Sequence, residues 1–171
     1  CKRDCGDSRR IPPVEVVLKQ PRTVGDFVHA DLADMVLVSD RFRQLYESGG
    51  FNGLSDWLPV KGRRQGSRGT DRYDPPRLWA VYFCTSSGRL DPNALGIQWM
   101  NEPETEWCPV CGPDGVEVRS IARFVVDPQA RPSEDFFRFA NLGQGYMASR
   151  RAVEAIREAR LENVSFVPIS R

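Results

Sequence analysis

The sequence predicts an α+β fold: a mixed, mostly antiparallel sheet with two main helices that come from two strand-helix-strand repeats. Three observations predict it. They are the repeat itself, a run of β-branched and aromatic residues between its two copies, and two cysteine pairs that are distant in the chain. The chain has 171 residues, of which 40% are hydrophobic, and this size suits one domain with its own core. We therefore expect a single domain at 1–171.

The first expected elements are a strand at 14–19 and then the first copy of the repeat, at 26–60. In this copy an apolar extended segment at 35–38 leads into Ser39, whose hydroxyl can accept a hydrogen bond from the free amides of a helix start. The helix after it is amphipathic, with an apolar stripe at Phe42, Leu45 and Tyr46. We expect this helix to stop at Gly49-Gly50 and a second strand to follow at 54–60.

The second copy, at 135–171, has the same order of elements. An extended segment at 146–148 precedes Ser149, and the next helix has the apolar stripe Ala152, Val153 and Ile156. This helix is expected to stop around Arg160, before a strand at 164–169.

The two copies align without a gap when Phe27 is matched to Phe137. In this alignment Gly53 falls on Asn163, and Gly and Asn are the residue types that best tolerate a left-handed backbone just beyond a helix. The alternative is a chance likeness, since any strand, serine cap, helix and strand share such features. Either way, the local structure is strand, helix, strand, twice.

The part between the copies, at 77–126, is expected to hold central strands and a cysteine knuckle. The segment 77–84 has the composition of a buried strand, in which Cys84 packs as a small hydrophobe, and a short strand is expected at 115–119. The segment 61–70 is rich in glycine and arginine and lacks apolar residues, so we expect a loop there.

The cysteine pairs predict a structural zinc site. Cys108 and Cys111 have the two-residue spacing of a metal knuckle, and the glycine after them can take the positive φ that such a turn needs. Cys1 and Cys5 have three residues between them and are also followed by glycine. Four thiolates together would complete a tetrahedral zinc-knuckle element. The alternatives are free thiols, disulfides, and a Cys1 that carries a lipid. The odd cysteine count and the absence of an apolar signal segment disfavour disulfides.

Catalytic motifs are absent from the sequence. The single histidine, His29, is expected to be a core or half-buried residue and not a base, and there is no G-x-S-x-G, phosphate-binding glycine loop or H-E-x-x-H motif. A zinc ion with four thiolate ligands also has no open position for water. We therefore expect a protein that is not an enzyme.

Two charged stretches are candidate binding surfaces. The net charge is only +1, so the chain offers no overall attraction to nucleic acid or to an anionic membrane, and no segment is long and apolar enough to span one. Locally, Glu102, Glu104 and Glu106 run up to Trp107 and could meet a basic partner, unless Trp107 simply packs over the metal. The second stretch holds Arg63, Arg64 and Arg68. Their side chains could contact phosphates or be merely solvated.

The cysteine knuckles and three later segments resemble the double-CXXCG-motif family. This is a group of paralogous proteins, best known from myxobacteria, that are regarded as immunity partners of polymorphic toxins. The segments that carry the resemblance are Asp135–Phe139, Ser149–Ile156 and Leu161–Phe166. At its first cysteine pair the family has the shorter C-x-x-C-G spacing and a preceding segment, so Cys5 matches the family pattern better than Cys1.

The resemblance implies a non-catalytic, cytoplasmic protein that binds and neutralises a cognate toxin protein. It transfers no catalytic residue. The alternatives are a zinc-ribbon-like regulatory or nucleic-acid-binding protein that uses the arginines above, and an enzyme of a kind without a recognised motif.

Overall fold

The computed structural model of the chain describes residues 14–18, 24–28, 35–64, 77–86, 97–99, 118–121, 126, 132–139 and 145–168. The strands of the main sheet are β1 (Val14–Leu18), β2 (Phe27–Val28), β3 (Met35–Ser39), β4 (Leu54–Arg64), β5 (Leu78–Ser86), β8 (Phe136–Phe139) and β9 (Met147–Ala148). A second sheet has two strands, β6 (Ile97–Trp99) and β7 (Val118–Ile121). The two helices are α1 (Asp40–Ser48) and α2 (Arg150–Glu158).

The main sheet is mixed and mostly antiparallel, as the sequence predicts. Its strand order is β1-β4-β5-β3-β2, and β8 joins the edge of β5 beyond β3 and pairs in turn with β9. The pairs β1–β4 and β5–β8 are parallel, and the other pairs of this sheet are antiparallel. The strands expected at 14–19 and 77–84 correspond to β1 and β5, and the one expected at 115–119 overlaps β7 at 118–119.

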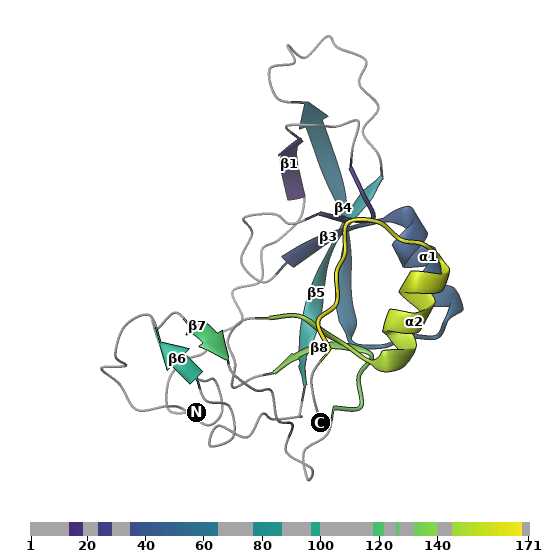
Figure 1. Ribbon diagram of the computed structural model, residues 1–171. Helices are drawn as coiled ribbons and strands as arrows, with labels where there is room; N and C mark the ends of the chain where they lie inside the picture. The colour runs from purple at the N-terminus through teal and green to yellow at the C-terminus, as the bar shows by residue number, and fades with distance from the viewer. Residues whose placement is uncertain are drawn as a thin grey trace.

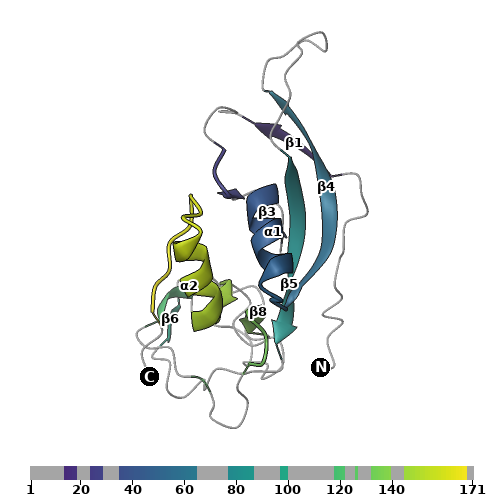
Figure 2. The ribbon, with the colours of Figure 1, turned by 90° about the vertical axis from the view of Figure 1, so that its right-hand side faces the viewer.

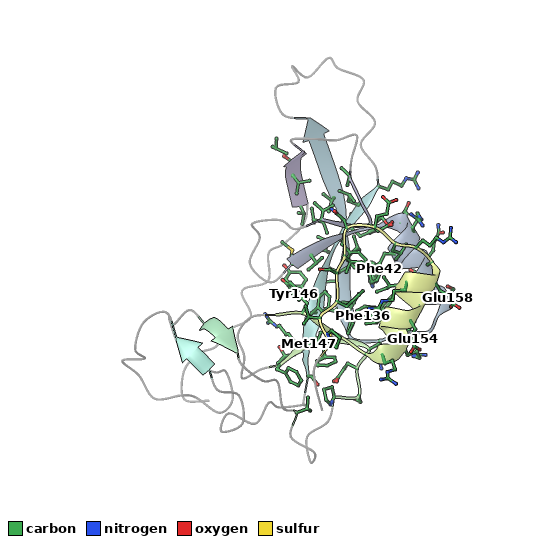
Figure 3. The ribbon with its side chains drawn as sticks, viewed as in Figure 1. Phe42, Phe136, Tyr146, Met147, Glu154 and Glu158 are labelled. Carbon is green, nitrogen blue, oxygen red and sulfur yellow. The ribbon has the colours of Figure 1, made fainter. Side chains whose placement is uncertain are left out.

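Both helices lie on the same side of the curled sheet (Figures 1 and 2). Phe42 of α1 is at the centre of the core between them, with the ring of Phe136 at 5.5 Å and that of Phe27 at 4.7 Å between centroids. Figure 3 shows Phe42 and Phe136 between the helices and the strands, while Glu154 and Glu158 point outward from α2. This aromatic core fixes the position of both helices.

The opposite face of the sheet buries a second apolar cluster. Its buried members are Val14, Met35, Leu37 and Ala80. The alternation along each strand divides the side chains between the two faces, because successive residues of a strand point in opposite directions.

A β-bulge in β4 keeps this alternation in register with β5. Ser55 pairs with Tyr82 and Leu58 with Ala80, so β4 has one residue more than β5 over this stretch, and Asp56 takes a positive φ of 56°. Beyond the bulge, Leu58 packs in the cluster away from the helices, whereas Trp57 packs in the core beneath α1.

The predicted helix starts are confirmed. The Ser39 hydroxyl accepts a hydrogen bond from the Phe42 amide, and the Ser149 hydroxyl accepts one from the Ala152 amide, each at 3.2 Å. Of the predicted apolar stripes, Phe42 and Tyr46 of α1 and Ala152 and Ile156 of α2 are buried, while Leu45 and Val153 are half-buried.

The predicted helix ends are confirmed too. The Phe51 amide donates to the Tyr46 carbonyl and the Leu161 amide to the Ile156 carbonyl, at 3.2 Å in each case. The residue before each donor is left-handed, with φ of 57° at Gly50 and 50° at Arg160. Both helices thus end in the same Schellman-type turn.

Three sequence expectations are wrong. Residues 61–64 are not a loop, because β4 continues to Arg64 and pairs with β1. Residues 164–168 form no strand. One edge of β5 pairs with β4 over Leu78–Phe83, and the other pairs with β3 and β8, so this segment finds no edge along those residues.

The third error is the gapless alignment of the two copies. Phe27 pairs with Val38 and Phe136 pairs with Ala148, so Phe27 corresponds to Phe136 and not to Phe137. The second copy therefore has one extra residue between its two strands. From Ser39 and Ser149 onward the expected correspondence holds.

Candidate functional site

A buried aspartate organises the start of the first repeat. Asp26 is only 4% exposed. Its carboxylate accepts a hydrogen bond from the Ser39 hydroxyl at 2.5 Å and one from the Arg41 guanidinium at 3.1 Å. The Asp26 carbonyl also accepts from the Ser39 amide at 3.0 Å. The aspartate thus fixes the serine that caps α1.

The second repeat has the same cluster. Asp135 accepts hydrogen bonds from the Ser149 hydroxyl at 2.7 Å and from the Arg151 guanidinium, and its carbonyl accepts from the Ser149 amide at 2.7 Å. We call the two groups the Asp–Ser–Arg clusters; they consist of Asp26, Ser39 and Arg41, and of Asp135, Ser149 and Arg151.

Each cluster also binds the turn that follows the helix of the other repeat. Asp26 accepts from the Glu162 amide at 2.9 Å, and Asp135 accepts from the Asn52 amide at 3.3 Å. The arginines do the same, because Arg41 donates to the Ala159 carbonyl at 3.1 Å and Arg151 to the Gly49 carbonyl at 3.4 Å. The contacts are reciprocal and join the two repeats into one body.

Opposing influences act on the pKa of Asp135. Burial by itself raises the pKa, but hydrogen bonds from Arg151, Ser149 and the Asn52 amide together bring it below the ordinary value of 3.8. Asp135 is therefore ionised at neutral pH, and its charge is part of the contact between the repeats. The cluster holds the start of α2 against the turn that follows α1.

The helix side of the sheet carries a second polar and aromatic group, around α1. The Arg43 guanidinium lies over two indole rings, 4.0 Å from the ring centroid of Trp79 and 5.6 Å from that of Trp57. Its Nε donates to Glu47 at 2.7 Å, and the indole N–H of Trp79 donates to Asp40 at 2.5 Å. We call these five residues the Trp–Arg surface.

The Trp–Arg surface is partly open to solvent. The side chain of Arg43 is 31% exposed and that of Glu47 is 55% exposed, while both tryptophans are half-buried. The Arg43–Glu47 and Trp79–Asp40 hydrogen bonds and the stacking of Arg43 on both indoles hold these side chains in one arrangement before anything binds.

The surface continues along the sheet beyond the helix. Pro59 pairs with Trp79 and is exposed, and Lys61 and Glu15, which pair with each other, are exposed on the same side. β1 and the far end of β4 extend past both helices (Figures 1 and 2). An exposed Val17, at 49%, adds an apolar side chain to this strip.

Most of the site residues expected from the sequence lie outside the described residues. This applies to all four expected zinc ligands and to most of the expected partner-binding residues: Cys1, Cys5, Cys108, Cys111, Glu102, Glu104, Glu106, Trp107 and Arg68. The backbones of Arg63 and Arg64 are described, at the end of β4 opposite Val17 and Leu18. His29 also lies outside the described residues, and Cys84 of β5 is half-buried with a free thiol.

Sequence reasoning missed the Asp–Ser–Arg clusters and the Trp–Arg surface. The first had a signal, because Asp26-Phe27 and Asp135-Phe136 are the same dipeptide at the start of each repeat. The second had none, since Arg43, Trp57 and Trp79 come from three different elements that meet only in the folded sheet.

Comparison with protein-family models and with curated proteins yields no significant match. Within the described ranges, no group of three or more His, Cys, Asp or Glu side chains could hold a metal ion. Neither described helix is long and apolar enough to cross a bilayer.

Proposed function

We propose that the protein is a non-catalytic protein-binding module, and specifically an immunity protein that binds and neutralises a cognate toxin in the cytoplasm. The toxin part of this proposal comes from the resemblance to the double-CXXCG-motif family. The binding part is supported by the Trp–Arg surface, which is the observation that carries the proposal.

Tryptophan and arginine are the residues that most often dominate the binding energy of protein interfaces. Here an arginine is stacked on two indoles and held by a carboxylate, so little side-chain entropy remains to be lost on binding. The reciprocal Asp–Ser–Arg clusters support the same proposal, because they join α1 and the strands beneath it to the second repeat and so stiffen the platform.

We also propose that Cys1, Cys5, Cys108 and Cys111 hold a structural zinc ion, which would connect the start of the chain to its middle. The ion would be closed to substrate and would stabilise the fold only. Elemental analysis of protein purified without added metal should give one zinc per chain, and Cys108→Ala should lower that content. A wild-type protein without zinc would contradict the site.

The experiment that tests the proposed function is capture of the partner from the native host. Tagged protein should retain one protein, encoded next to its own gene, and co-expression of the two should abolish the toxicity of that protein. Repeated capture without any specific protein would refute the proposal.

Variants of the captured complex test the surface itself. Arg43→Ala should weaken binding about 30-fold or more, as expected for truncation of an interface hot spot. Arg150→Ala is the matched control, because Arg150 is an exposed arginine at the start of the other helix. Equal binding by the two variants would mean that the partner is recognised elsewhere.

A further inference from the structure

The end of α2 borders an open pocket of about 320 Å³, which lies between the helix and the segment that follows it. Its apolar lining is Ile156, Leu161, Val164 and Phe166, and Arg157 and Arg160 also line it. None of these residues belongs to the Trp–Arg surface, so the pocket is a separate feature.

The corresponding positions of the first repeat carry larger side chains. Ile156 corresponds to Tyr46, which is buried and whose hydroxyl accepts a hydrogen bond from the Leu54 amide at 3.1 Å. Leu161 corresponds to Phe51, whose ring packs at 6.5 Å from that of Tyr46. Two aromatic rings of the first repeat are thus replaced by two aliphatic side chains in the second.

The chain segments differ in the same way. After α1 the segment enters the sheet as β4, where Leu54 pairs with Phe83, whereas 164–168 form no strand and leave room beside α2. A second detail fits this difference. A Cβ at Gly49 would lie 2.3 Å from the Phe51 ring, but Ala159 is accommodated at the same position because Leu161 is smaller.

The pocket also differs from its counterpart in charge. Arg157 and Arg160 stand where the first repeat has Glu47 and Gly50. Within the part of the chain that the structure describes, neither guanidinium has a hydrogen-bond or ion-pair partner. The C-terminal end of a helix carries a partial negative charge, which disfavours an anion. The positive charges of Arg157 and Arg160 therefore make the pocket suitable for one.

We infer that this pocket binds an aromatic ring that carries a carboxylate. The ring of the ligand fills the space that the rings of Tyr46 and Phe51 fill in the first repeat. Its carboxylate accepts hydrogen bonds from Arg157 and Arg160, whose planar guanidinium groups suit paired hydrogen bonds to the two oxygens. A volume of about 320 Å³ is at the lower end of ligand pockets, which span about 300–1,000 Å³, so it suits a single ring-sized group.

A titration of the isotope-labelled protein followed by NMR tests this inference. The probe is 3-phenylpropionate, and the matched control is 3-phenylpropionamide, which has the same ring but no charge. The acid should shift the methyl signals of Ile156, Leu161 and Val164 in a saturable manner. The affinity for the amide should be lower than that for the acid by a factor of about ten or more. No saturation with the acid, or equal binding of acid and amide, would overturn the inference.

Two variants locate the binding. The double substitution Arg157→Ala with Arg160→Ala should reduce the affinity for the acid to that for the amide, while Arg150→Ala should leave it unchanged. Leu161→Phe together with Ala159→Gly restores the arrangement of the first repeat and should block both probes. Unchanged binding of the acid to both pocket variants would refute the site.

A peptide that ends in phenylalanine distinguishes the two sources of such a group. Tighter binding of the peptide than of its C-terminal amide and of 3-phenylpropionate would identify a chain terminus as the ligand. Binding of 3-phenylpropionate without the peptide would identify a free aromatic acid, and either result supports the inferred chemistry.

Discussion

At the scale of single residues, the two repeats contact each other at places where a glycine of one repeat lies against the backbone or a side chain of the other. A Cβ at Gly53 would lie 1.9 Å from the Phe136 carbonyl oxygen and 3.1 Å from the Cβ of Glu134. At the reciprocal contact, a Cβ at Gly25 would lie 2.6 Å from the Cβ of Asn163. Each turn can therefore approach the other repeat only because one side of the contact has no side chain.

Gly53→Ala should destabilise the protein strongly. Gly53 has a φ of 97°, so alanine would add backbone strain to the collision with Phe136, and we expect a loss of about 3 kcal/mol or more in the free energy of unfolding. Denaturant unfolding measures this loss.

Gly50→Ala is the control for backbone strain alone. Gly50 also has a positive φ, of 57°, but a Cβ there meets nothing within 4 Å, so the cost should be about 1 kcal/mol. Equal losses for the two variants would show that the close approach to Phe136 does not matter for stability.

At the scale of elements, each repeat is a short hairpin followed by a helix, and an aspartate connects the two. The local parts of this unit could be predicted from the sequence. Ser39 and Ser149 cap helices because of their position before an apolar stripe, and Gly53 and Asn163, with φ of 97° and 65°, follow helices in left-handed conformations as expected.

The parts that depend on distant residues could not be predicted. Asp26 contacts a residue 136 positions later and Asp135 one 83 positions earlier, and no local pattern reports such a contact. The register of the second hairpin was ambiguous because Phe136 and Phe137 are adjacent. The length of β4 was missed because pairing with β1, and not composition, makes 61–64 a strand.

The cluster around Asp135 should make stability depend on pH. Because the folded state lowers the pKa of this carboxyl below 3.8, its contribution is fully present above that pH and is lost as the pH falls through the folded-state pKa. Asp135→Asn should therefore cost about 2 kcal/mol at pH 7, as for hydrogen bonds to a charged group, and the difference from wild type should shrink in acid.

Thermal unfolding between pH 7 and pH 2.5 measures this dependence. Glu154→Gln is the control, since Glu154 is an exposed carboxylate on the outer side of α2 (Figure 3), and its difference from wild type should stay small throughout. A constant difference between Asp135→Asn and wild type over the whole range would rule out the ionised carboxylate as the stabilising group.

At the scale of the whole molecule, two similar units have the same scaffold but different surfaces. Reciprocal hydrogen bonds keep the units in a fixed relation, and the aromatic core around Phe42 fills the space between them. On this frame the first unit presents tryptophan and arginine beside an exposed strip of sheet, whereas the second presents an open pocket. The common frame explains the fold, and the differences between the units carry the proposed recognition.

The fold class could be predicted because the periodic patterns of helices and strands are local. The binding surface could not, because Arg43 and Trp79 become neighbours only through the pairing of β3 with β5. The cysteine pairs, which the sequence makes prominent, lie outside the described residues, so the zinc site stays a prediction.

The most direct test of the proposed function is amide hydrogen exchange of the protein, free and bound to the partner captured from the host. The Trp–Arg surface predicts that binding slows exchange in α1 and in the strand residues around Trp57 and Trp79, while α2 exchanges as before. A stable complex in which α1 and these strands exchange at their free rates would contradict the proposal.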